Sequence, residues 1–86
     1  MQISVAVIEF DGGIDIYTGY DLHDLNGKVY DEYITKWWDD ADAGPIPDDP
    51  AEAIALYFDY ITWESITYTE TDISEYIRAR GGKVHA

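Results

Sequence analysis

Carboxylates are the chemically active groups that this sequence holds in greatest number. Its 86 residues include 18 Asp and Glu, 5 Lys and Arg, 2 His and no Cys. Carboxylates can bind hard cations such as calcium, act in pairs as acid and base, or attract a basic partner. The absence of cysteine excludes disulfides, thiolate catalysis and cysteine-ligated metals. The possible functions therefore depend on what the acids do.

The densest acidic stretch, residues 37–49 (WWDDADAGPIPDD), is the best candidate for a calcium loop. An EF-hand loop needs oxygen ligands at positions 1, 3 and 5, glycine at position 6 and glutamate at position 12. A loop that begins at Asp39 places Gly44 correctly, but positions 3 and 5 hold Ala41 and Ala43 and position 12 holds Pro50. A loop that begins at Asp40 brings the glycine one position too early. We therefore predict no metal and no cofactor.

Catalytic groups of other kinds are sparse. With 18 acids in one small domain, some pair must lie at the spacing of a glycosidase, so such a pair carries little information. The two histidines, His23 and His85, lie far apart in the sequence and outside any motif. The chain has no phosphate-binding loop, no nucleophile elbow and no HExxH zinc motif. We predict that the protein is not an enzyme.

The net charge of −13 is the strongest property of the sequence. Arg78, Arg80 and Lys83 lie in the last nine residues, so Lys28 and Lys36 are the only basic residues before them. A compact chain of this length is roughly 30 Å across, a length over which duplex DNA carries about 18 charges. Direct binding to nucleic acid is disfavoured because no basic patch is present. Attraction to a basic partner, such as a protein surface that binds nucleic acid, fits the charge better.

Adaptation to high salt is a second explanation of the acidity. Proteins of salt-loving organisms are acidic and poor in lysine, and this chain has twelve Asp and six Glu against five basic residues. The eleven Ile and thirteen aromatic residues do not, because salt-adapted chains usually hold fewer large apolar side chains. The longest apolar runs, such as residues 5–8, are too short to span a bilayer, and the first ten residues lack the positive charge of a signal peptide. We expect a cytoplasmic protein.

The hydrophobic pattern predicts one α+β domain over residues 1–80 and a flexible tail over residues 81–86. Strands are expected at 2–10 and 14–18, joined by a turn at 11–13. In the second strand Ile14, Ile16 and Thr18 alternate with Asp15 and Tyr17, and Ser65, Thr67 and Thr69 alternate in the same way in a third strand at 63–71.

Two helices are expected between the second and third strands. Asp21 can cap the first, with Asp24 in a capping-box position, although the helix could also begin after Asn26-Gly27. At 100° per residue its apolar stripe places Trp37 in the core and Trp38 at the margin, where Trp38 becomes a candidate interface residue.

A connector at residues 43–47 leads to the second helix, which Asp48 or Asp49 caps with Pro50 at its first position. Asp72 is expected to cap a short third helix that ends at Ala79. The order β-β-α-α-β predicts a two-layer fold, in which two helices cover a three-stranded antiparallel sheet.

The candidate partner-binding residues are the acids expected at the surface together with Trp38. They are Asp24, Asp31, Glu32, Trp38, Asp39, Asp40, Asp42, Asp48, Asp49, Glu64 and Glu70. The alternative is an intracellular interaction or assembly module that uses aromatic residues around Trp38, with the acidity serving solubility or salt adaptation.

Four segments resemble small acidic proteins of phages and prophages. They are ISVAVIEFDGGIDIYTGY, KVYDEYITKWWDD, GPIPDDPAEAIALYFDY and WESITYTETDI, and together they span about residues 3–73. The turn at residues 10–13 departs from that class, in which it contains a histidine. By size, acidity and lack of catalytic residues the chain is also similar to anti-CRISPR and antirestriction proteins, several of which imitate the charge of DNA. The resemblance implies an inhibitor that binds a CRISPR effector or restriction enzyme in a host cell and blocks DNA binding. We expect the protein to be a monomer or a homodimer.

Overall fold

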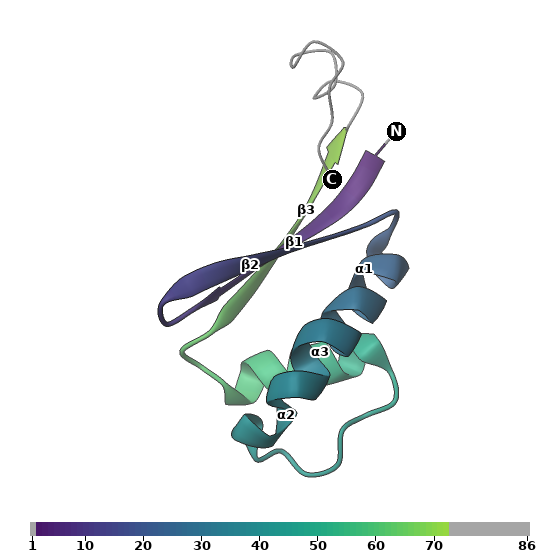
Figure 1. The fold of residues 1–86 in the computed structure, drawn as a ribbon. Coiled ribbons are helices and arrows are strands. Elements are labelled where there is room, and N and C mark those ends of the chain that lie inside the picture. Colours follow the sequence, from purple (N-terminus) through teal and green to yellow (C-terminus); the bar gives the residue numbers. More distant parts are fainter. Residues whose placement is uncertain (1, 73–86) are drawn as a thin grey trace.

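A computed structural model of the chain describes residues 2–72. Its elements are β1 (Gln2–Phe10), β2 (Gly13–Gly19), α1 (Leu22–Val29), the π-helix η1 (Tyr30–Ile34), α2 (Thr35–Ala41), α3 (Pro50–Tyr60) and β3 (Ser65–Asp72). Because α1, η1 and α2 form one continuous helix, the predicted order β-β-α-α-β is confirmed (Figure 1). The predicted short helix and tail after Asp72 lie outside the described residues.

The three strands form one antiparallel sheet in the order β2-β1-β3. β1 and β2 are joined by a tight turn in which Gly12 has a φ of 99°, a conformation that glycine adopts without steric cost. At the other end of β2, a Cβ on Gly19 would lie 2.5 Å from the backbone nitrogen of Leu25. Glycine at this position therefore lets α1 approach the sheet closely.

Both helices lie against the same side of the sheet, as Figure 1 shows. Alternate residues of β1 point toward them, so that Ala6 and Ile8 are fully buried and Ser4 nearly so. The remaining core residues come from the helices and the segment after α3. They are Leu25, Val29, Tyr33, Ile34, Trp38, Ala41, Ala53, Ile54, Tyr57 and Ile61. The predicted two-layer α+β arrangement is thus confirmed.

The first helix begins at its early start site and continues through Asn26-Gly27. The Asp21 carboxylate accepts a hydrogen bond of 2.8 Å from the backbone N–H of Asp24. The Asp24 carboxylate accepts one of 3.0 Å from the N–H of Tyr20 and lies 3.6 Å from the Lys28 ammonium. Both aspartates therefore satisfy backbone groups that a helix start leaves without partners.

The expected positions of the two tryptophans are wrong, and η1 is the reason. A π-helical turn holds one residue more than an α-helical turn, so it rotates every later side chain by about 100° relative to a regular helix. Trp38 is consequently buried, 6 % exposed, and its indole N–H donates a 2.8 Å hydrogen bond to the carbonyl of Gly44. Trp37, which was expected in the core, is 42 % exposed.

One open alternative is resolved, and one further boundary differs from expectation. Asp49, not Asp48, caps α3, since its carboxylate accepts a 3.2 Å hydrogen bond from the N–H of Glu52. Asp72 was expected to start a helix but is the last residue of β3, where it pairs with Gln2. Strand pairing with β1 therefore extends the sheet at the point where the local sequence favours a helix cap.

Candidate functional site

An acidic cleft of about 540 Å³ opens between the β1–β2 hairpin and the first helix. Its lining residues are Phe10, Asp11, Asp15, Tyr17, Glu32, Tyr33, Lys36, Trp37, Asp40 and Glu64. Five carboxylates and four aromatic rings therefore surround a single lysine. We refer to these residues as the acidic cleft.

The carboxylates of the acidic cleft raise the pKa of tyrosine side chains in and near it. Burial, followed by the charges of Asp15 and Glu32, raises the pKa of Tyr17. These two acids come from β2 and η1, so the effect reflects the meeting of the hairpin with the π-helix. Burial and then Glu64 raise the pKa of the neighbouring Tyr57, and Asp40 adds a smaller contribution.

The lysine of the acidic cleft is already engaged. The Lys36 ammonium lies 5.1 Å from the centre of the Trp37 ring, within the range of a cation–π contact. Trp37 itself is 42 % exposed, so the pair lies at the surface of the cleft. The pair leaves the surrounding carboxylates without an ion pair to Lys36.

Glu64 was expected as an exposed acid on the third strand, and this expectation is wrong. It precedes β3, is half-buried, and accepts hydrogen bonds from the hydroxyls of Tyr33 and Tyr57, the latter at 2.9 Å. Burial and the Glu64 carboxylate together raise the pKa of both tyrosines strongly. Glu64 therefore joins the core of aromatic rings to the end of the sheet.

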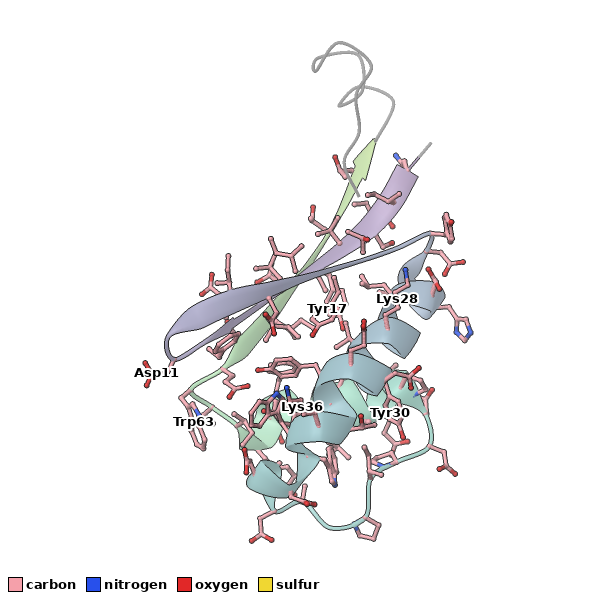
Figure 2. All side chains as sticks on the ribbon, viewed as in Figure 1. Asp11, Tyr17, Lys28, Tyr30, Lys36 and Trp63 are labelled. Atoms are coloured by element: carbon pink, nitrogen blue, oxygen red, sulfur yellow. The ribbon has the colours of Figure 1, made fainter. Side chains whose placement is uncertain are left out.

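A second cleft, of about 550 Å³, lies on the neighbouring side of the hairpin turn. It shares Phe10, Asp11 and Glu64 with the acidic cleft and is also lined by Trp63, which is 66 % exposed. Figure 2 shows Asp11 and Trp63 at this hairpin end of the molecule and Lys28 near the opposite end of the first helix. Two exposed tryptophans thus flank the same acidic turn.

The predicted partner-binding residues differ in exposure and role. Asp31, Glu32, Asp39, Asp40, Asp42, Asp48, Asp49 and Glu70 are exposed, Asp24 and Glu64 are half-buried, and Trp38 is buried. The acidic cleft brings together Glu32, Asp40 and Glu64. Glu70 pairs with Ser4, at the opposite end of β1 from Phe10, and is therefore roughly 20 Å away along the strand.

Sequence reasoning missed seven of the ten lining residues of the cleft, among them Asp11, Asp15 and Trp37. Asp11 had been assigned only to the turn. The alternation of β2 does place Asp15 opposite Ile14 and Ile16, on the side that faces the helices. Its place in the same cleft as Glu32 comes from the packing of β2 against η1, which no local sequence pattern shows.

Within residues 2–72, no three Asp, Glu or His side chains are arranged so that they could hold a metal ion. In the same part of the chain, no helix has the length and apolar character needed to cross a membrane.

The chain matches no protein-family model, no curated protein and no solved structure.

Proposed function

We propose that the protein is a non-enzymatic inhibitor that binds the basic surface of a host nucleic-acid-binding defence complex and blocks DNA binding. The complex would be a CRISPR effector or a restriction enzyme, as the resemblance to anti-defence proteins implies. One observation carries the proposal: the helical side of the molecule carries a net charge of −8. Residues 22–61, which form this side, hold ten acids and two lysines.

Both lysines of the helical side have partners within the chain. Lys28 donates a 2.9 Å hydrogen bond to the carbonyl of Thr18 and pairs with Asp24. Lys36 lies over Trp37. The exposed acids Asp31, Asp39 and Asp42 consequently face solvent with little positive charge to offset them, which favours association with a cationic surface.

The number of acids per unit length is compatible with imitation of a nucleic acid. The described residues carry 17 acids, and the long axis of the molecule is 47 Å. Over that length a single DNA strand carries about 14 phosphates and a duplex about 28. The acid density of the chain lies between these two values, so a surface that binds phosphates would meet a comparable charge.

The acidic cleft supplies the most specific contact for such a surface. Arginine is the residue that most often binds phosphates, and its guanidinium pairs with carboxylates and stacks on aromatic faces. Asp15, Glu32 and Asp40 provide carboxylates in the cleft, and Trp37 provides a ring at its mouth. An arginine of the partner that normally contacts DNA would find both kinds of contact here.

The proposal is tested by capturing partners from a host lysate on immobilised protein at low salt. Retained proteins should elute along a salt gradient, because exposed charge pairs weaken as the Debye length falls from about 10 Å at 0.1 M to 3 Å at 1 M. They should also elute when duplex DNA is added, because the DNA competes for the same basic surface. Mass spectrometry then identifies the class of partner.

A triple variant, Asp39→Lys with Asp40→Lys and Asp42→Lys, is the control for this capture. All three positions are exposed, so the variant should fold and should lose the captured proteins. Proteins that stay bound to the triple variant, or that neither salt nor duplex DNA releases, would show that charge imitation is not the basis of binding.

The exposed aromatic residues support a second candidate, an interaction module that binds through apolar contacts. Trp37, Tyr60 and Trp63 are 42 %, 52 % and 66 % exposed, and interface hot spots favour such side chains. Trp38, around which this alternative was first placed, is in the core. If Trp37→Ala and Trp63→Ala abolish capture while the aspartate reversals do not, the aromatic module is the correct function.

A further inference from the structure

The side of the sheet that faces away from the helices is nearly free of charge. Its side chains follow from the strand register: Ile3, Val5, Val7 and Glu9 on β1, Ile14, Ile16 and Thr18 on β2, and Ser65, Thr67, Thr69 and Thr71 on β3. We call these eleven residues the outer face. Glu9 is the only charged residue among them, in a chain whose net charge is −13.

Aliphatic side chains occupy the middle of the outer face, and hydroxyl groups occupy one flank. Val7 lies between Ile16 and Thr67 in the pairing of the three strands, and Val5 lies between Thr18 and Thr69. Ile14 and Ile16 are 58 % and 60 % exposed. No described residue outside the sheet covers this side, as Figure 1 shows for the helices. The central strand is therefore apolar on a face that is open to contact.

Charge decides which kind of partner suits the outer face. A basic protein or a nucleic-acid-binding surface would be attracted to the helical side, where the acids are, and would gain nothing from valine, isoleucine and threonine. Among the described residues the acids lie almost entirely outside the outer face, so they repel a second copy that approaches from any other side. This face is thus the place where two such acidic chains can approach with the least repulsion.

The dimensions of the outer face suit a weak dimer. Three strands about 4.8 Å apart and about 30 Å long give a footprint of roughly 400 Å². The accessible area is larger because side chains stand out from the sheet, which brings it near the low end of specific interfaces, about 600 Å² per partner.

We propose that two copies of the chain associate through their outer faces, sheet against sheet, around a two-fold axis that crosses the strands. Sheets that pack face to face keep their strands within about 30° of each other. This axis places each Glu9 opposite the far end of β1 in the second copy, so the two glutamates do not meet. The acidic helical sides then point away from each other, and both remain free to bind a partner. The dimer does not depend on the proposed inhibitory function.

The test is sedimentation velocity on the full chain over about 5 to 500 µM at two salt concentrations, since a weak dimer forms by mass action. The mass should rise from 9.8 kDa to twice that value with increasing concentration. Raising the salt from about 0.05 to 0.5 M should tighten the dimer, because salt screens the repulsion between the acidic chains. Salt should weaken the binding of a basic partner to the acids, whereas it should strengthen the dimer. The two proposals can therefore be contradicted independently of each other.

Ile16→Lys and Leu22→Lys form a matched pair for this experiment. The two side chains are 60 % and 53 % exposed, one on the outer face and one in α1, and both changes alter the net charge equally. Ile16→Lys should weaken the dimer at least about tenfold, which corresponds to about 1.4 kcal/mol, and Leu22→Lys should leave it unchanged. Thermal melts followed by circular dichroism verify that both variants fold.

Methyl spectra provide a readout in the unaltered chain. The signals of Val7, Ile14 and Ile16 should shift with protein concentration, and those of the buried Ile34 and Ile54 should not. A chain that stays at 9.8 kDa across the whole concentration range overturns the proposal. The outer face would then have another occupant, such as a different protein, or none. A dimer that Leu22→Lys disrupts and Ile16→Lys does not would overturn the proposal as well.

Discussion

The helical side and the outer face belong to the same small domain but differ in almost every surface property. On the helical side, exposed aspartates follow the first helix and the connector, and a cleft gathers carboxylates around Trp37. On the outer face, β-branched side chains and hydroxyls surround a single glutamate. Solubility alone would favour acids on both sides. The difference indicates that each side is suited to a different contact, one driven by charge and one by apolar area.

The largest expected effect concerns the packing that supports the helical side. Trp38→Ala should lower the free energy of unfolding by about 3–5 kcal/mol, because it leaves a cavity and removes the hydrogen bond to Gly44. Urea denaturation followed by circular dichroism measures this change. Trp37→Ala, the matched exposed position, should cost less than about 1 kcal/mol. Equal losses at the two positions would mean that the helical phase set by η1 is incorrect.

High pH should destabilise the fold through Tyr33 and Tyr57, whose hydroxyls both donate to Glu64. Tyr33 and Tyr57 have raised pKa values in the folded chain, whereas tyrosines of an unfolded chain ionise near pH 10. Their contribution to stability is therefore complete below pH 10 and is lost as the pH rises above it. Each tyrosine should lower the unfolding free energy by up to about 1.4 kcal/mol per pH unit in this range.

Denaturation curves between pH 9 and 12 test the alkaline prediction. Tyr33→Phe should flatten the decline, and Tyr20→Phe, at a position 78 % exposed, should not. If Tyr33→Phe leaves the decline unchanged, the hydrogen bonds to Glu64 do not govern the ionisation of these tyrosines.

A smaller effect is expected at Gly27, in the middle of α1. A Cβ there meets no atom within 4 Å, so alanine fits without strain. Gly27→Ala should stabilise the chain by about 0.5–1 kcal/mol, because glycine loses more backbone freedom than alanine when a helix forms. The midpoint of thermal unfolding measures the gain. A lower midpoint would show that the helix needs glycine at this position.

The smallest expected effect is that of salt on folding itself. Screening of the acids on the helical side should raise the thermal midpoint slightly, and the rise should level off near 1 M, where the Debye length is about 3 Å. Melts from low to multi-molar salt measure it. A large stabilisation that continues at several molar would favour salt adaptation and would remove the need for a basic partner.

Local chemistry made much of the fold predictable. The alternation in β1 and β2 and the glycines of the turn indicate the hairpin, and the caps at Asp21 and Asp49 follow from residue types that accept backbone N–H groups. The order of elements then restricts the topology to a small number of two-layer folds.

The composition of the candidate site was less predictable, because it depends on tertiary contacts. Trp37 and Trp38 exchange roles through one additional residue in a helical turn. Glu64 resembles any surface acid until the two tyrosine hydroxyls that bind it are known. Neither feature is encoded in a local pattern of residues.

The most direct test of the central claim compares two triple variants of equal net charge. The first carries Asp39→Asn, Asp40→Asn and Asp42→Asn on the helical side, and the second carries Thr18→Lys, Thr67→Lys and Thr69→Lys on the outer face. Titration calorimetry at low salt measures how tightly each binds a short oligoarginine peptide. We predict that the first variant binds at least about tenfold more weakly than the unaltered chain and that the second binds nearly as well as it. Equal weakening in the two variants would contradict the account, because total charge would then matter and its location would not.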